Sequence, residues 1–186
     1  LNLGYPGGPV VERLAAGGDA GKIKFTLPKI SDGRPDFSFS GLKTAVSRYV
    51  RENAIEPLRE NEPPTREIKD IAASFQATVV KTLVGTLEKL ATELQPKTLI
   101  VAGGVACNAA LREAAESLGE KLNLPVYFPS KHLSTDNAAM IAAAGYFHLK
   151  NGKRSDLRLT ADVTLRLQNF ENEDEKLKTK KVRYKL

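Results

Sequence analysis

Two short segments place amide and carboxylate side chains where a strand-like pattern gives way to a helix-like one. The first, residues 103–108, begins with Gly103 and Gly104 and ends at Asn108. Glycines let a ligand approach the backbone, and the helix start that follows offers unpaired N–H groups to an anion or a sugar. Asn108 adds a hydrogen-bond donor and an acceptor. Taken alone, the segment fits a ligand-binding loop and a tight turn between strand and helix equally well.

The second segment, residues 134–137, brings Asp136 to the start of a helix. An aspartate in this position usually caps the helix or complements its dipole. The alternative is a ligand for a hard cation, because carboxylate oxygen suits Mg²⁺ or Fe²⁺. The two histidines of the sequence, His132 and His148, are too few for a metal shell rich in imidazole. We expect His132 on the surface and His148 at the carboxyl end of a helix, where it would complement the dipole.

Two segments nearer the amino terminus give weaker signals. Residues 5–12 place Gly7 and Gly8 before a short helix in which Glu12 lies one turn along. A ligand's anion or hydroxyl group could bind there, and an ordinary loop-to-helix entry with an exposed acid is the alternative. Residues 38–44 predict the start of a helix that carries Lys43, and chemistry alone assigns this lysine no role.

The two strand-end segments belong to a predicted βαβ unit at about residues 98–129. Residues 98–102 form a short β-branched run without alternation, which predicts a strand buried on both faces of a parallel sheet. A helix follows Asn108, and residues 125–129 form the next strand after a right-handed crossover. A further helix is expected at about 136–149. Ligands of open α/β sheets bind beyond the carboxyl ends of the strands, so both segments should lie at that edge.

Helices are predicted on the amino-terminal side of this unit. Apolar residues at helical spacing from Leu42 to Val50 predict one helix. Residues 65–94 predict a long amphipathic helix with Thr65 as its N-cap and Pro96 just beyond its end. The apolar residues that share one face of the long helix are Ile68, Ile71, Ala72, Phe75, Val79, Leu83, Leu87, Leu90 and Leu94. This face is expected to pack into the core of a lobe.

The composition is that of an ordinary globular protein, with 186 residues, 41% of them hydrophobic and 27% charged. The lone cysteine, Cys107, excludes a disulfide framework, and no apolar run reaches the roughly 20 residues of a membrane helix. The net charge of +6 comes from the last eleven residues, which hold six bases and no acid. A solvated terminus explains this run better than a phosphate-binding arm. Because the chain starts at Leu1 without a signal pattern, we expect a piece of a longer, cytoplasmic protein.

Four segments in this order resemble one family. They are residues 5–9, 37–44, 102–108 and 135–142, with the sequences YPGGP, FSFSGLKT, AGGVACN and TDNAAMIA. From Leu1 to about Lys153 the chain closely resembles the carboxyl-terminal half of the tRNA N6-adenosine threonylcarbamoyltransferases, formerly described as O-sialoglycoprotein endopeptidases. The resemblance implies an α/β fold of the actin-like ATPase, sugar-kinase and ribonuclease H-like type. Residues 1–153 would form one lobe with a helical insertion, and 154–186 an extension whose last residues are disordered.

The resemblance also implies an activity and a site. The family transfers threonylcarbamoyl from threonylcarbamoyl-AMP to the adenosine beside the anticodon of tRNAs that read ANN codons. The positions that match its nucleotide-binding residues are Gly8, Glu12, Gly103, Gly104 and Asn108, and Asp136 matches a metal ligand. One divalent metal per subunit is implied, Fe²⁺ by family, with Mg²⁺ or Zn²⁺ as alternatives. The implied partners are tRNA, a paralogous lobe-like subunit and a small ATPase, and no membrane.

The chain departs from the family pattern in one respect that matters for function. The family's other metal ligands form a His-x-x-x-His pair in the amino-terminal lobe, and this sequence contains no such pair. Ser134 and Cys107 replace residues that the family often has as Cys and Ala, without loss of a required group. We therefore expect half a site and no activity from the chain alone. A non-catalytic nucleotide-binding or partner-docking lobe is the alternative function, and a serine peptidase is disfavoured because only two histidines are present.

Overall fold

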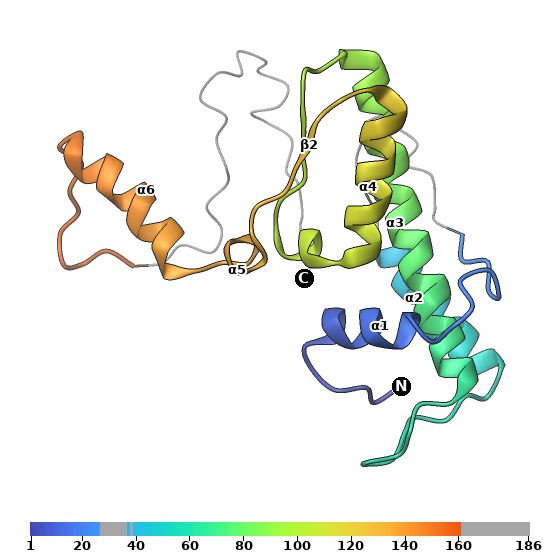
Figure 1. Ribbon diagram of the computed structural model, residues 1–186. Coiled ribbons are helices and arrows are strands. Elements are labelled where there is room, and N and C mark those ends of the chain that lie inside the picture. The colour runs from blue at the N-terminus through green and yellow to red at the C-terminus, as the bar shows by residue number, and fades with distance from the viewer. Residues whose placement is uncertain (27–36, 38, 161–186) are drawn as a thin grey trace. The chain divides into compact units, whose positions relative to one another are not determined.

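The computed structural model describes residues 1–26, 37 and 39–160, and the chain divides into two compact units, Leu1–Met140 and Ile141–Leu186 (Figure 1). The elements, in chain order, are α1 (Gly7–Ala15), α2 (Ser40–Glu52), α3 (Arg66–Leu94), β1 (Leu99–Ile100), the 3-10 helix η1 (Gly104–Cys107), α4 (Ala109–Leu122), β2 (Val126–Tyr127), α5 (Lys131–Ser134) and α6 (Ala138–Lys150). The predicted disorder at the carboxyl end concerns residues that lie outside the described part of the chain.

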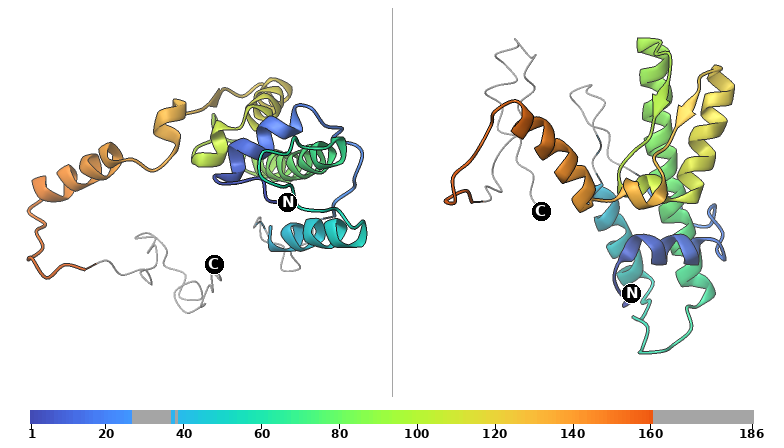
Figure 2. Two further views of the ribbon diagram at one scale, coloured as in Figure 1. Left: turned by 90° about the horizontal axis from the view of Figure 1, so that it is seen from below. Right: turned by 60° about the vertical axis from the view of Figure 1, so that its left-hand side comes forward.

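Helix α3 is the longest element of the first unit and begins and ends where the sequence indicates. The Thr65 hydroxyl accepts a hydrogen bond from the N–H of Ile68 at 3.3 Å, which satisfies one of the free donors of the first turn. The helix ends at Leu94 because Gln95 adopts the left-handed conformation, with φ +46°, and Pro96 follows. Both α1 and α4 pack against α3: α1 crosses it near its start, and α4 lies beside its later part (Figures 1 and 2).

Two apolar clusters cover the two ends of α3. The first joins Leu14 and Ala15 of α1 to Ile68, Ala72 and Ala73 of α3. The second joins Ala91 of α3 to strand β1 and helix α4, with Leu99 and Leu118 buried among them. The predicted apolar face is therefore buried at its start, from Ile68 to Ala72, and half-buried from Phe75 to Leu90. Ala91, which is buried near the other end of the helix, was not in the predicted stripe.

Leu94 does not belong to this buried face, and its inclusion in the predicted stripe is wrong. Its side chain is 73% exposed. The second cluster reaches along α3 only as far as Ala91, and the three residues that follow it in the helix, 92–94, are exposed in the part of the chain that the structure describes.

Strands β1 and β2 pair in parallel, with Leu99 opposite Val126 and Ile100 opposite Tyr127. Together with α4 they form the predicted βαβ unit. The expectation of a strand buried on both faces is wrong, because Ile100 is 72% exposed while its neighbour Leu99 is 4% exposed. Successive side chains of a strand point to opposite faces, and among the described residues helices pack on the Leu99 face alone.

Helix α2 carries the predicted stripe on its more buried side. Leu42 is fully buried, and the Tyr49 ring meets Phe25 edge-on, with ring centroids 6.0 Å apart. Lys43 is exposed on the other side of the helix. The predicted helix start at residues 38–44 also includes Ser38, which lies outside the described residues.

Polar contacts fasten the loop after α1 to α3. The Asp70 carboxylate, in a residue that is 7% exposed, accepts from the N–H of Asp19 at 2.8 Å and pairs with Arg66 at 3.0 Å. The Ser74 hydroxyl accepts from the N–H of Ile23 and donates to the Asp19 carbonyl. These bonds bring the loop so close that a Cβ on Gly18 would overlap the Lys69 carbonyl and lie 2.9 Å from the Ala73 Cβ.

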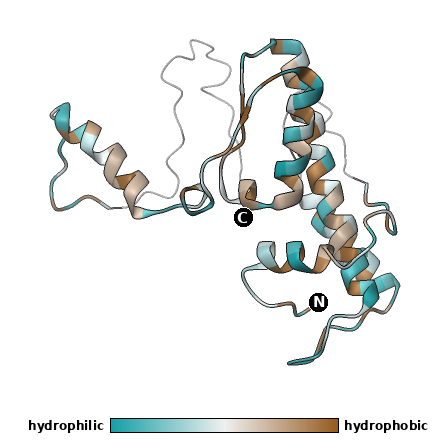
Figure 3. Cartoon of the chain, in the orientation of Figure 1, coloured by the Kyte–Doolittle hydropathy of each residue, from teal (hydrophilic) through white to brown (hydrophobic). Residues whose placement is uncertain are grey.

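Helix α6 begins in the first unit and continues into the second. It matches the helix predicted at about 136–149, and none of its side chains is buried. Figure 3 shows that apolar residues follow most of its length. The described part of the chain holds no helix with the length and hydropathy needed to span a bilayer. Beyond α6, Arg158 donates to Asp156 and so lowers the pKa of that carboxyl below its usual value.

The close approach at Gly18 leads to a stability prediction. Gly18→Ala should lower the free energy of unfolding by about 1–3 kcal/mol, because the added methyl forces the loop away from α3. The matched control is Gly85→Ala, in the interior of α3, where a Cβ would meet no atom within 4 Å. The control should raise stability by roughly 0.5–1 kcal/mol through helix propensity. Urea denaturation of both variants measures the difference, and equal stabilities would contradict the packing described.

Candidate functional site at the strand exits

The loop after β1 leaves its backbone open to a ligand. Gly103 has φ +93°, a conformation that favours glycine, and a Cβ there would meet no atom within 4 Å. The chain then makes the short turn η1 and enters α4 at Asn108. Gly8, in the first turn of α1, is equally open. Three of the residues expected to approach a ligand through their backbone, Gly8, Gly103 and Gly104, thus have space beside them.

Asn108 organises the start of α4. Its side-chain oxygen accepts from the N–H of Leu111 at 3.0 Å, and its amide nitrogen donates to the Gln76 Oε1 at 2.8 Å. Both ends of the amide are therefore engaged within the protein. Each end also keeps some capacity, because the amide group has a second N–H and the oxygen a second lone pair. The expected ligand contact and the cap are compatible in the same side chain.

Glu12 reaches the same place from a distant part of the sequence. Its Oε1 accepts from the N–H of Ala109, the first residue of α4, at 2.7 Å. The carboxylate complements the free N–H groups and the positive end of the helix dipole. Its second oxygen has no donor among the described residues, so it can accept a hydrogen bond from a hydroxyl of a ligand. The structure thereby joins the segment at Gly8–Glu12 to the loop at Gly103–Asn108.

Asp136 is exposed between α5 and α6, and it is not the cap of α6. The cap is Asn137, whose side-chain oxygen accepts from the N–H of Met140 at 3.0 Å. The cap interpretation of Asp136 is therefore wrong. Within the described residues no group donates to the Asp136 carboxylate. The neighbouring Thr135 methyl lies 3.9 Å from the position that a Cβ would take on Gly104, so the Asp136 segment adjoins the loop after β1.

The Asp136 carboxylate fits one ligand position of a hard divalent metal, since it is exposed and leaves its oxygens free of described donors. No group of three or more His, Cys, Asp or Glu side chains gathers around a common point in the described residues. His132 is exposed, with Nε2 3.4 Å from the Ser130 hydroxyl, and His148 is exposed in the last turn of α6. The described part of the chain thus offers no complete metal shell.

Sequence reasoning missed two polar residues that support the site. Gln76 of α3 holds the Asn108 amide, as described above. Arg112 of α4 donates to the carbonyls of Ala106 and Pro129 and lies over the Phe128 ring. The only signal for Arg112 in the sequence is its place one turn after Asn108. Gln76 has no such signal, because its partner Asn108 is 32 residues away.

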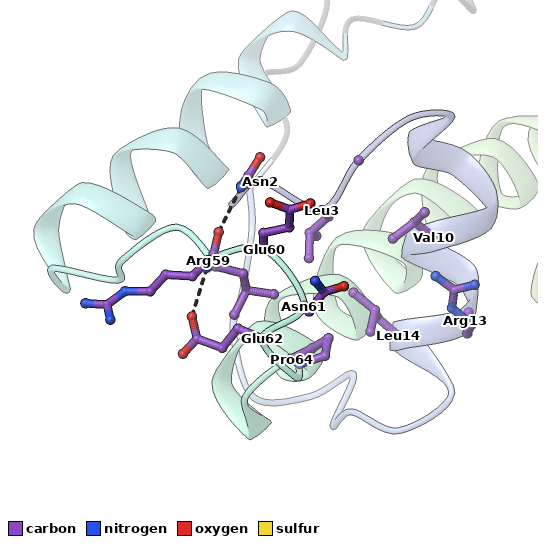
Figure 4. Close-up of a pocket in the computed structure, with 12 residues that line it drawn as sticks. Asn2, Leu3, Val10, Arg13, Leu14, Arg59, Glu60, Asn61, Glu62 and Pro64 are labelled. Atoms are coloured by element: carbon purple, nitrogen blue, oxygen red, sulfur yellow. Dashed lines mark hydrogen bonds between the residues drawn. The ribbon is translucent and has the colours of Figure 1, made fainter.

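A cavity of about 520 Å³ lies elsewhere, between α1 and the chain before α3 (Figure 4). Leu3, Val10 and Leu14 line one part of it, and Arg13 and Glu60 are among its polar residues. None of the expected site residues lines this cavity. It is therefore distinct from the strand-exit site.

The fold defines an α/β class of protein, in which two parallel strands are joined through a helix and the candidate site residues gather beyond the carboxyl ends of the strands. The family model described as TsaD, tRNA N6-adenosine threonylcarbamoyltransferase, matches residues 1–143. The chain belongs to this family. Membership implies an actin-like, ribonuclease H-like α/β fold, with which the helix-rich unit and its small parallel sheet are consistent.

Curated relatives bear the same name, tRNA N6-adenosine threonylcarbamoyltransferase. The chain is 46% identical to the protein of Carboxydothermus hydrogenoformans, over 90% of this chain and 47% of the relative. It is 43% identical to that of Koribacter versatilis, over 90% of this chain and 52% of the relative, and 44% identical to that of Thermosipho africanus, over 90% and 48%. The chain thus spans about half the length of the curated relatives it matches.

The double role of Asn108 can be separated by substitution. Asn108→Asp keeps the oxygen that caps α4 but removes the amide donor and with it the bond to Gln76 Oε1. Because the Gln76 amide can turn its nitrogen toward the new carboxylate, the melting temperature should fall less than in Asn108→Ala. Asn108→Ala loses the cap as well and should cost about 1 kcal/mol of stability. If the free N–H binds a nucleotide, both variants should weaken adenylate binding by about 1–3 kcal/mol. Calorimetric titration with AMP tests this, and unchanged affinity in Asn108→Asp would leave Asn108 a purely structural cap.

Proposed function

We propose that this chain is the carboxyl-terminal lobe of an enzyme that transfers threonylcarbamoyl from threonylcarbamoyl-AMP to the adenosine beside the anticodon of tRNAs reading ANN codons. Family membership supports the reaction class. The observation that carries the proposal is the meeting of Glu12 with the start of α4 beside Asn108, since it assembles the expected nucleotide-binding groups at the strand exits.

Each group has a part in the proposed reaction. The second oxygen of Glu12 accepts from a ribose hydroxyl of the adenylate, and the open backbone at Gly103 and Gly104 admits the nucleotide close to the start of α4. Asp136 supplies one ligand of a divalent metal, Fe²⁺ by family with Mg²⁺ or Zn²⁺ as alternatives. The bound metal would polarise the threonylcarbamoyl carbonyl. The adenosine amine attacks that carbonyl carbon, the bond from the carbon to the phosphate oxygen breaks and AMP leaves, and the amine gives up one proton to the departing phosphate or to water. The chain therefore needs no nucleophilic side chain of its own.

The rest of the enzyme's site and its assembly belong to the same proposal. The remaining metal ligands would be a histidine pair in an amino-terminal lobe. The macromolecular partners would be tRNA, a paralogous lobe-like subunit and a small ATPase, in the cytoplasm. Residues 1–153 would constitute the lobe, and the actin-like architecture would close a cleft over the adenylate.

A second candidate is a non-catalytic nucleotide-binding or partner-docking lobe. The observation that favours it is the single metal ligand, Asp136, in the described part of the chain. The two functions differ in what the Asp136 carboxylate does. A binding lobe needs Glu12 and Asn108 but not a metal-binding carboxylate.

Asp136→Asn tests the proposed function in the full-length protein. Asn137 keeps the cap of α6, so the melting temperature should change little. Loss of the charged ligand should lower metal affinity and the rate of threonylcarbamoyl transfer to tRNA, each by at least about tenfold, since even the residues that support a metal ligand are worth about 10–100-fold. The matched control is Asp156→Asn, an exposed aspartate outside the site, which should leave both unchanged. Metal analysis and a tRNA modification assay provide the measurements.

Two outcomes would contradict the proposal. Full metal content and full activity in Asp136→Asn would remove Asp136 from the metal site. Robust transfer by residues 1–186 alone would show that the missing histidine pair is not required. We expect the chain alone to be inactive.

A further inference from the structure

Arg112 connects the two loops that leave the parallel strands. Its Nε donates to the Ala106 carbonyl in η1 at 2.6 Å. Its terminal nitrogen donates to the Pro129 carbonyl, beyond the end of β2, at 3.0 Å. The guanidinium also lies over the Phe128 ring, with Cζ 4.6 Å from the ring centroid. One side chain thus bridges both strand exits.

The contacts depend on the shape of the guanidinium group. Its planar fork directs separate N–H groups at two acceptors while its face stacks on an aromatic ring, and a lysine ammonium offers neither plane nor fork. The side chain is half-buried, which limits competition from water for the two carbonyls. Arg112 is therefore better suited to fixing the separation of the loops than to providing charge at the surface.

The two loops carry different groups of the proposed site. The Ala106 loop lies between Gly104 and Asn108, at the nucleotide-binding positions. The Pro129 segment continues through α5, where the Ser134 hydroxyl bonds back to the Ser130 carbonyl at 3.1 Å, to the exposed Asp136. A second link between the loops is a weak contact from the Cys107 Sγ to the Lys131 carbonyl at 3.5 Å.

We infer that Arg112 is a positioning residue that fixes the Asp136 loop relative to the nucleotide-binding loop. The inference rests on the proposed function, because it assigns the nucleotide to one loop and the metal to the other. Without the Arg112 bridge, each loop keeps its own ligand-binding groups, since Asn108 is still held by Gln76 and Asn137 still caps α6. What changes is the distance between the two bound ligands. A misplacement of about 1 Å between reacting groups lowers a rate by about 100-fold.

The test uses Arg112→Gln and Arg112→Lys in the full-length enzyme. The matched control is Lys121→Gln, on the same helix, which removes a cation that pairs with Glu88 of α3 at 2.6 Å, outside the strand exits. Four quantities are measured for each variant: the melting temperature, kcat and KM for transfer, and the NMR relaxation of the AMP phosphorus by Mn²⁺ bound to the enzyme. The last quantity reports the separation of metal and nucleotide without any turnover.

For Arg112→Gln we expect kcat to fall at least tenfold with KM within threefold of the parent value, and the relaxation of the phosphorus to change at equal Mn²⁺ and AMP occupancy. Arg112→Lys, which keeps the charge and can reach one carbonyl, should be intermediate in both measurements, and Lys121→Gln should match the parent. If Arg112→Gln does not fold, Arg112→Lys provides the comparison.

The inference is overturned if the arginine variants match Lys121→Gln in kcat and phosphorus relaxation, or if activity falls only in proportion to the folded fraction. Failure of the proposed function gives a different result. In that case the parent enzyme shows no transfer, and the phosphorus relaxation still shows whether Arg112 sets the distance between the two ligands.

Discussion

The free N–H groups at the start of α4 are the constraint on which the rest of the site depends. The first N–H groups of a helix have no partner within it and must find one elsewhere. Here Asn108 provides one acceptor from within the loop, and Glu12 provides another from 97 residues away. Satisfying these donors therefore fixes where α1 meets α4, and Gln76 adds the link to α3. The hydrogen bonds that satisfy the start of α4 thus bring α1, α3 and the loop after β1 together.

Helix α3 makes this arrangement possible because it holds α1 and α4 on one scaffold. An apolar cluster at each of its ends fixes one of the two helices, and the buried Asp70 and Ser74 hold the loop after α1 in place. Between these ends Gln76 lies at the height of the Asn108 amide. The scaffold thus sets the positions of groups that lie far apart in the sequence, while local capping sets their orientations.

Local signals in the sequence sufficed for much of the fold. Thr65 and Pro96 marked the limits of α3, and glycine, asparagine and alanine around residue 108 marked a strand-to-helix loop. The exposure of Ile100 was not predictable from its run of β-branched neighbours, because burial of a strand face depends on what packs against it. The contacts of Glu12 and Arg112 escaped prediction for a related reason. Their partners are backbone groups, which carry no signature in the side-chain pattern. The capping role that the sequence suggests for Asp136 belongs to Asn137. Helix boundaries inferred from a sequence pattern are uncertain by one or two residues, so the pattern could not distinguish the two.

The stability of helix α6 depends on burial of its apolar side chains. A helix of 13 residues has a length at which an isolated helix is only marginally stable in water. Its side chains are apolar along most of its length, and the exposed ones include Ile141, Tyr146 and Phe147. A helix that is apolar on all sides derives its stability from burial. The helical content of this segment, as circular dichroism measures it, should therefore depend on how much of its apolar surface is buried. The helix propensities of its residues should matter less.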